Sequence, residues 1–426
     1  MQNLRQIILL PFLLLFALLT GCSGGGSSST PPPPPGKVTV TVVDDQEAAI
    51  AGAQIQVFDA ESGNPIATLT SGADGSASAS YYEDNIQLKV SAQGYAPSPA
   101  AGIPPQPIAL IPGQEEAISV TLAPLDPTLQ IGSISGKVLD TGDLPVSGAL
   151  VTAEDPSGAT IATAHADHLG DYILYNIPAG DVTLSAWIVG LNFTPSAAIT
   201  VADGDVLSGE NITASGTANG TVSGKVSFTA TTGDIVDITL LQPGSREVLP
   251  GMRTYIDASG NFVLSYVPNG TFEIIASLEN DGYVLDPDTS VTQGVPEVTI
   301  NNNTVTRDLK VTGSINLTSP PSNLTYAPLP ELSATPTFTW EKDSSYASAD
   351  DYVIEVVDES SNTVWGGFGP APTFTPQVTV PQGNNPQVLY GGPALETGKV
   401  YQLRVYALSY DATATGFTLL SSSETL

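Results

Sequence analysis

One fourteen-residue pattern occurs twice in the chain and constrains its fold strongly. It reads Asp-x-x-Gly-x-(Tyr/Phe)-x-Leu-x-x-(Ile/Val)-Pro-x-Gly, over residues 167–180 and 257–270. Asp at the start of a turn accepts hydrogen bonds from the following backbone, and Gly takes the positive φ that closes the turn. The aromatic residue and Leu share one face of a strand, which Pro then ends because it has no N–H to donate. The turn residues are Asp167, Gly170, Pro178 and Gly180, then Asp257, Gly260, Pro268 and Gly270.

The triplet Gly-Lys-Val is a second marker and opens a strand-like segment at residues 36–38, 136–138 and 224–226. These starts are 100 and 88 residues apart, which is the size of a small sandwich domain. The first segment alternates at Val38, Val40 and Val42 and is followed by a turn at residues 74–75 that looks shortened. It has no Pro-x-Gly step. The sequence therefore predicts three related domains, of which the first is degenerate.

Composition supports many short strands joined by turns. Gly (41) and Pro (35) are abundant, while 41% of residues are apolar and only 13% are charged. Together with the alternating runs, this predicts an all-β chain: a tandem array of small antiparallel β-sandwiches, immunoglobulin-like or transthyretin-like. Short linkers lead us to expect a semi-rigid, elongated array. The net charge of −31 argues against binding to nucleic acid.

The repeats resemble the carboxypeptidase regulatory-like domain, a transthyretin-like sandwich of bacterial surface proteins. The resemblance covers roughly residues 37 to 312 and is carried by the turn pattern and the strands around it. It implies an accessory domain that brings no zinc ligands and no peptidase activity. We place the three domains at residues 37–124, 130–216 and 217–313.

The segment 314–426 has a different texture and predicts a fourth sandwich. Phe338 and Trp340 alternate with threonines, and the stretch 395–407 carries Leu-x-x-Gly-x-x-Tyr before another alternating strand. This stretch resembles the region of fibronectin type III domains in which a tyrosine bonds to the backbone just upstream. The resemblance implies that Tyr401 bonds near Leu395 and that Trp340 lies in the core.

The first 36 residues predict export and anchoring. Arg5 precedes an apolar run over residues 7–19, which is long enough for a signal peptide and too short for a membrane span. The run ends in Leu19, Thr20, Gly21 and Cys22, which resembles a bacterial lipobox; Cys22 is the only cysteine. We expect a signal peptide over 1–21, a lipid on Cys22 and a Gly/Ser/Pro tether over 22–36. Ser23 after the cysteine favours the outer membrane over the inner one, by resemblance.

Acidic loops are the candidate metal sites, because hard cations such as Ca²⁺ take carboxylate oxygens. The candidates are Asp203 and Asp205 in one loop and Asp286 and Asp288 in another. The alternative is that these loops are simply solvated turns, and no other cofactor is expected. His165 and His168, the two histidines, flank Asp167, and we interpret them as part of a solvated turn rather than as metal ligands.

Aromatic pairs are the candidate ligand contacts, since exposed rings can stack on sugars. They are Tyr81 with Tyr82 and Trp365 with Phe368. The alternative is that they pack inside the sandwiches. No motif for a nucleophile, a nucleotide or a zinc ion occurs, so we expect no enzymatic activity.

These features predict a non-enzymatic cell-envelope lipoprotein that presents binding modules for adhesion or for capture of a polysaccharide or protein. Two alternatives stay open. The chain can be a structural accessory subunit of an outer-membrane or periplasmic complex, or an accessory module for a separately encoded enzyme. The sequence leaves open which face of the outer membrane the domains occupy.

Overall fold

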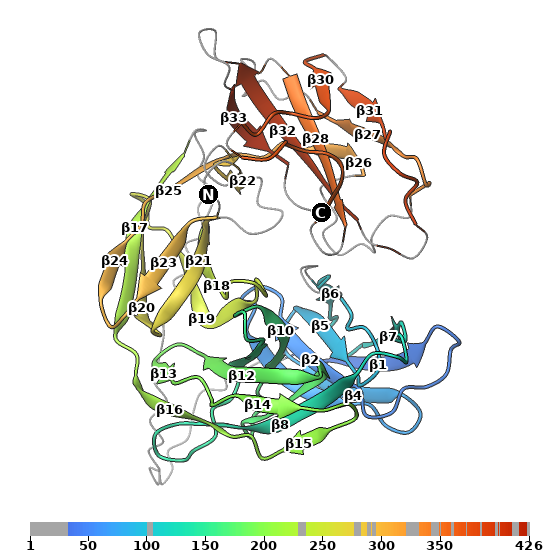
Figure 1. Ribbon diagram of the computed structural model, residues 1–426, viewed down its shortest axis with the longest axis vertical. Helices are drawn as coiled ribbons and strands as arrows, with labels where there is room; N and C mark the ends of the chain where they lie inside the picture. The colour runs from blue at the N-terminus through green and yellow to red at the C-terminus, as the bar shows by residue number, and fades with distance from the viewer. Residues whose placement is uncertain are drawn as a thin grey trace, which may run out of the picture.

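The all-β prediction is confirmed: four pairs of small β-sheets follow one another along the chain in the computed structural model (Figure 1). The structure describes residues 33–99, 105–228, 236–276, 283–287, 291, 295–320, 332–341, 349, 351–358, 362–371, 373–383, 386–396, 399, 401–410 and 417–423. We number the sandwiches domains 1 to 4. In domains 1 to 3, the first sheet contains the domain's first strand and the second sheet contains its second strand.

Domain 1 comprises β1 (Gly36–Asp44), β2 (Gln54–Asp59), β3 (Pro65–Thr70), β4 (Ser76–Tyr81), β5 (Asn85–Ser91), β6 (Ile108–Ala109) and β7 (Glu115–Leu122). Its first sheet has the order β4-β1-β7 and its second sheet the order β3-β2-β5-β6. Val38, Val40 and Val42 alternate into the core between the two sheets.

Domains 2 and 3 share one topology. Domain 2 comprises β8 (Ile131–Leu139), β9 (Leu150–Glu154), β10 (Thr160–His165), β11 (Asp171–Pro178), β12 (Gly180–Trp187), β13 (Leu191–Phe193), β14 (Ile199–Val201), β15 (Val206–Ser208) and β16 (Ile212–Thr217). Domain 3 comprises β17 (Gly220–Phe228), β18 (Asp237–Leu241), β19 (Val248–Tyr255), β20 (Asn261–Val267), β21 (Gly270–Ala276), β22 (Tyr283–Leu285), β23 (Glu297–Ile300), β24 (Thr304–Thr306) and β25 (Leu309–Gly313). The sheet orders β11-β8-β16-β13 and β10-β9-β12-β14 of domain 2 recur as β20-β17-β25-β22 and β19-β18-β21-β23 in domain 3.

The first and last strands of each of these three domains run parallel to each other. The first strand lies beside the last one: β1 pairs with β7, β8 with β16 and β17 with β25. The other named pairs within the two sheets are antiparallel, apart from β15 with β8 and β24 with β17. The chain therefore enters and leaves each first sheet in the same direction.

The turn before the fourth strand is built alike in domains 2 and 3. Asp167 Oδ1 accepts hydrogen bonds from the amides of Leu169 and Asp171 at 2.8 and 2.9 Å. Gly170 takes a φ of 75°, and its carbonyl accepts a 2.8 Å bond from the Val138 amide. A Cβ on Gly170 would lie 2.7 Å from the Val138 carbonyl oxygen, so no larger residue fits without movement.

Domain 3 repeats this geometry. In domain 1 the turn differs from the shortened one that the sequence suggests. Asp257 Oδ1 accepts from the amides two and four residues on, and the Gly260 carbonyl accepts from Val226 at 2.8 Å. In domain 1 the Gly72 amide donates to Ser76, and the Gly75 carbonyl accepts from Val42, also at 2.8 Å. The turn at residues 72–76 is therefore full length, with Gly72 in place of the aspartate.

The Gly-Lys-Val triplets do not all occupy the same place. Directly after the repeated turn, Asp171 pairs with Lys137 in domain 2 and Asn261 pairs with Lys225 in domain 3. In domain 1 the equivalent residue after the turn is Ser76, and it pairs with Thr41. The triplet at 36–38 thus lies four residues too early to be equivalent. A four-residue shift preserves the inward and outward alternation of a strand, so the sequence pattern could not expose it.

The step after the fourth strand is a bulge with a change of direction. Pro178 ends β11 and Gly180 starts β12, while Pro268 follows β20 and Gly270 starts β21. Two residues before each proline, Asn176 and Tyr266 have a positive φ of 59°. The register of β11 against β8 shifts between Leu174 and Ile177, which accommodates the extra residue.

Domain 4 has a three-stranded and a four-stranded sheet with one extra strand. Its strands are β26 (Leu317–Ser319), β27 (Thr337–Trp340), β28 (Asp351–Asp358), β29 (Thr363–Gly366), β30 (Thr379–Pro381), β31 (Gln387–Leu389), β32 (Tyr401–Tyr410) and β33 (Phe417–Ser422). The sheet orders are β26-β27-β31 and β29-β28-β32-β33, and β30 pairs with β28. Phe338 and Trp340 are buried in its core, and Tyr401 Oη accepts a 3.1 Å bond from the Glu396 amide.

The expectation of an elongated array is wrong for domains 1 to 3. Domains 1 and 2 lie side by side, and domain 3 folds back against both (Figure 1). Asn176 of domain 2 donates through its side chain to the carbonyls of Ala92 and Tyr95 in domain 1. Trp187 of domain 2 packs edge-on against Phe272 of domain 3, with ring centroids 5.5 Å apart. The three domains therefore form one packed unit.

Candidate functional site

The second sheets of domains 1, 2 and 3 meet in a polar contact region, which we call the three-domain junction. In each sheet the second strand is buried on both faces, although only one face lines the domain's own core. The outward side chains, buried by the neighbouring domains, are Gln54, Gln56 and Phe58 on β2, Leu150 and Thr152 on β9, and Asp237, Thr239 and Leu241 on β18.

Glu247 of domain 3, directly before β19, lies at the centre of the junction. Its carboxylate forms a salt bridge with Lys89 on β5 of domain 1. It also accepts a long hydrogen bond of 3.5 Å from Thr163 Oγ1 on β10 of domain 2. Burial favours the neutral acid, but the charge of Lys89, these hydrogen bonds and, once protonated, His165 lower the pKa of Glu247 below its ordinary value. One carboxylate thus joins three domains.

His165, at the end of β10, is the second ionisable group buried at the junction. Its ring packs edge-on against Phe58 of domain 1, with centroids 4.9 Å apart, and its carbonyl accepts a 2.9 Å bond from Gln56 Nε2. Burial lowers the pKa of His165 to about 4, although Glu247 opposes this shift and Lys89 adds to it. The imidazole is therefore neutral at pH 7.

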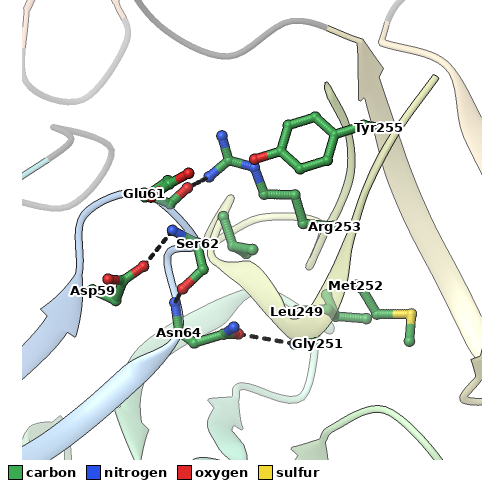
Figure 2. Close-up of a pocket in the computed structure, with 10 residues that line it drawn as sticks. Asp59, Glu61, Ser62, Asn64, Leu249, Gly251, Met252, Arg253 and Tyr255 are labelled. Carbon is green, nitrogen blue, oxygen red and sulfur yellow. Dashed lines mark hydrogen bonds between the residues drawn. The ribbon is translucent and has the colours of Figure 1, made fainter. Parts of the chain in front are cut away.

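A cleft of about 300 Å³ opens between domains 1 and 3 (Figure 2). Its walls are the turn after β2 and strand β19. The residues that line it are Asp59, Glu61, Ser62, Asn64, Val248, Leu249, Gly251, Met252, Arg253 and Tyr255. None of these lining residues is a histidine or a cysteine.

Hydrogen bonds across the cleft hold its two walls together. The Arg253 guanidinium of domain 3 donates to the Glu61 carbonyl of domain 1 (Figure 2). It also forms a salt bridge with Asp237 of its own domain. Nearby, Asn64 Oδ1 accepts a 3.2 Å bond from the Gly251 amide. The cleft therefore exists only while domain 3 is docked on domain 1.

Tyr255 supplies the exposed aromatic surface of the cleft. Its side chain is half exposed, and its ring lies beside the Arg253 guanidinium (Figure 2). Partial burial raises the pKa of Tyr255, Arg253 opposes the shift, and three nearby carboxylates add to it. The cleft combines an aromatic ring, hydrogen-bonding groups and an apolar floor from Leu249 and Met252, a mixture that can contact a ligand.

The predicted acidic metal ligands are not brought together among the described residues. Asp203 accepts a 3.3 Å bond from the Ile131 amide and Asp205 a 2.8 Å bond from the Ala202 amide, so both stabilise the turn before β15. Asp286 belongs to domain 3, is buried, and pairs with Lys310 at 2.9 Å. Asp288 lies outside the described residues.

The two histidines are also separated. His165 is buried at the junction and His168 is exposed in the following turn, so the interpretation of both as a solvated turn is wrong for His165. Within the described ranges, no three His, Cys, Asp or Glu side chains gather closely enough to hold a metal ion.

Three of the four candidate ligand aromatics pack against hydrophobic cores. Tyr81 is buried in the core of domain 1. Trp365 packs on Phe338 and Tyr390, and Phe368 stacks on Phe417 in domain 4. Tyr82 alone of the four is largely exposed. The aromatic pairs therefore do not form the stacking surfaces that their sequence positions suggested.

The predicted anchor cannot be placed in the structure. Leu19, Thr20, Gly21 and Cys22 lie outside the described residues, as does most of the tether. The described residues contain no helix with the length and hydropathy of a membrane span.

Two segments of the chain match the family model of the carboxypeptidase regulatory-like domain, residues 37–123 and 133–215. This confirms the resemblance for domains 1 and 2. Domain 3 has no such match, and its assignment as a third copy is supported by its sheet orders, which repeat those of domain 2. No curated protein matches the chain.

Solved structures of other β-sandwich proteins are similar at low sequence identity. They include the Bacillus anthracis TIE protein (13% identity, 66% of this chain, 51% of that chain, TM-score 0.19). A streptococcal ancillary pilin (12%, 65% and 98%, TM-score 0.20) and a DUF3823 family protein from Bacteroides uniformis (12%, 49% and 98%, TM-score 0.21) are further examples. These scores are too low to indicate a shared domain arrangement or function.

Proposed function

We propose that this chain is a non-enzymatic, lipid-anchored protein of the cell envelope whose β-sandwich domains bind a protein or a polysaccharide, for adhesion or capture. The observation that carries the proposal is the order of parts in one chain. A lipobox ending at Cys22 is followed by a Gly/Ser/Pro tether and then by regulatory-like domains at residues 37–123 and 133–215. A lipid, a spacer and packed modules are what a protein needs to present a binding surface away from a membrane.

A non-enzymatic role is supported by the matches to regulatory-like domains, which are accessory and non-catalytic. In the cleft, Arg253 is held by Asp237. The cleft residues offer hydrogen bonds and an aromatic face to a ligand.

We place the binding site in the cleft between domains 1 and 3. The groups available to a ligand are the Glu61 carboxylate, the Asn64 amide nitrogen and the half-exposed Tyr255 ring. Such a mixture of one ring and a few polar groups is typical of ligand sites.

We propose a fibronectin type III-like module for domain 4. Its two β-sheets, the buried Trp340, and the bond from the Glu396 amide to Tyr401 support this assignment. We treat it as a spacer or additional binding module.

Two measurements test the proposed function. Cys22→Ser should abolish incorporation of a fatty-acid label, and labelling that survives the substitution would contradict the anchor. Digestion of domain 4 by protease added to intact cells would support a surface-exposed binding protein in the outer membrane. Protection until lysis would favour the alternative, a structural subunit of a periplasmic complex.

A further inference from the structure

Among the described residues, the three-domain junction contains buried polar atoms whose hydrogen-bonding capacity is not used. Three buried side-chain oxygens on its outward faces have no hydrogen-bond partner in the described part of the chain: Gln54 Oε1, Asp237 Oδ1 and Thr239 Oγ1. Buried polar atoms without partners weaken the closed arrangement, because they would regain hydrogen bonds to water if the domains separated. The favourable contacts of the junction therefore have to offset the unfavourable free energy of these unpartnered oxygens.

The junction also contains a titratable base, the imidazole of His165, which the docked domains shield from water. The His165 ring packs on Phe58, and its carbonyl accepts a hydrogen bond from Gln56, both on β2 of domain 1. The charged groups that act on it are Glu247, which attracts a proton, and Lys89, which repels one. Because these two already form a salt bridge, Glu247 is not free to compensate a second positive charge fully.

We propose that the three-domain junction is an acid-operated latch: protonation of His165 releases domain 1 from domains 2 and 3 and so takes apart the cleft between domains 1 and 3. The proposal rests on the proposed function, because it describes how ligand binding at that cleft would be regulated. Each domain keeps its own core when the latch opens, since the cores of domains 1, 2 and 3 are separate clusters.

The direction of the effect follows from linkage. In the closed unit burial lowers the pKa of His165 to about 4, while exposed histidine has a value near 6.5. The open form therefore binds a proton more readily, and closure is lost as the pH falls from about 6.5 towards 4. Over that interval the ratio of closed to open molecules should fall on the order of 100-fold. Glu247, whose pKa is lowered in the closed form, acts in the same direction at still lower pH.

The latch can be measured as a distance between domains, without any ligand. In the full chain with Cys22→Ser, spin labels are attached through Ser78→Cys on β4 and Ser265→Cys on β20, both exposed positions. Double electron–electron resonance should give one narrow distance distribution at pH 7.5 and an added, broader population at pH 4.5. Far-ultraviolet circular dichroism at both pH values checks that the sandwiches remain folded.

The two histidines provide matched variants. His165→Gln removes the buried titrating group and should suppress the acid-induced population, whereas His168→Gln removes the exposed one and should behave like the parent. If His165→Gln disturbs docking at pH 7.5, His165→Asn supplies a smaller neutral side chain for the same comparison. Identical distributions at both pH values in the parent, or an equal response in the His165 variants, would overturn the latch. Either result leaves the proposed lipid anchor and surface binding intact, because those are tested by labelling and proteolysis.

Discussion

Lys89 and Glu247 lie 158 residues apart in the sequence and form a salt bridge between domain 1 and domain 3. Both side chains are mostly buried, and the Lys89 ammonium also lies 5.2 Å from the centre of the Phe58 ring. The pair therefore stabilises a contact between two domains that are not neighbours along the chain.

Removing one member of this pair should weaken the docking of domain 3 more than removing both members. Lys89→Met leaves Glu247 as a buried charge without its partner and should destabilise docking by about 3 kcal/mol. The double variant Lys89→Met with Glu247→Leu should recover part of that loss, because neither charge remains. Denaturant unfolding of the two single variants and the double variant measures the coupling. Additive losses would show that the two side chains do not interact.

Asn176 should contribute to docking of domain 2 on domain 1 through its side chain. It donates to two carbonyls and accepts from the Gly94 amide at 2.7 Å. Asn176→Gly keeps the positive φ available and removes all three bonds, so docking should weaken by about 2 kcal/mol. Small-angle scattering should report a larger radius of gyration at neutral pH. Tyr266→Gly, at the equivalent position of domain 3, removes an exposed ring and serves as the control.

Gly170 should tolerate alanine poorly for two separable reasons. Its φ of 75° is strained for any residue with a Cβ, and that Cβ would lie 2.7 Å from the Val138 carbonyl oxygen. Gly158 has a φ of 85° and open space around it, so Gly158→Ala measures the backbone strain alone. We expect Gly170→Ala to cost at least about 1 kcal/mol more than Gly158→Ala in urea unfolding. Equal losses would mean that the strand β8 moves freely to make room.

Asp257 should show an acid-dependent contribution to the stability of domain 3. Hydrogen bonds from the backbone and side chain of Asn261 and the backbone of Ser259 lower the pKa of Asp257 below 3.8. A carboxylate whose pKa is lowered by folding stabilises above its unfolded pKa and loses that effect as the pH falls through the folded value. Asp257→Ala should therefore destabilise the protein at pH 6 and make little difference at pH 2. Asp257→Asn, which keeps an acceptor oxygen, should retain more stability at pH 6.

Strand alternation and turn chemistry predicted the fold class, because both depend on residues close together in the sequence. The Asp-x-x-Gly pattern of domains 2 and 3 forms the expected turn, with Gly170 and Gly260 at positive φ. The sequence alone places the first Gly-Lys-Val triplet in the wrong register, because side chains alternate every second residue and Val38 and Val42 therefore face the same side. The hydrogen bond from the Val42 amide to the Gly75 carbonyl shows that Val42 is the residue equivalent to Val138 and Val226.

The junction could not be predicted, because many of its residues are polar. Gln54, Gln56 and Thr239 alternate with core residues and so look like solvent-facing positions. Their burial depends on a contact between segments more than 100 residues apart. His165 carried one usable signal: in domain 3, Tyr255 occupies the end of the equivalent strand β19 and is half exposed, so histidine is not required by the repeat itself.

The parallel pairing of first and last strands gives these domains a mechanical property. When a sandwich is pulled by the segments that enter and leave it, parallel neighbours such as β1 and β7 slide lengthwise past each other instead of peeling apart one bond at a time. The load is then shared at once by the hydrogen bonds along the register from Lys37 to Asp44. We expect domain 1, which has the longest such register, to resist stretching with a high rupture force in single-molecule pulling. An envelope protein held at one end and bound at the other would be loaded in this way.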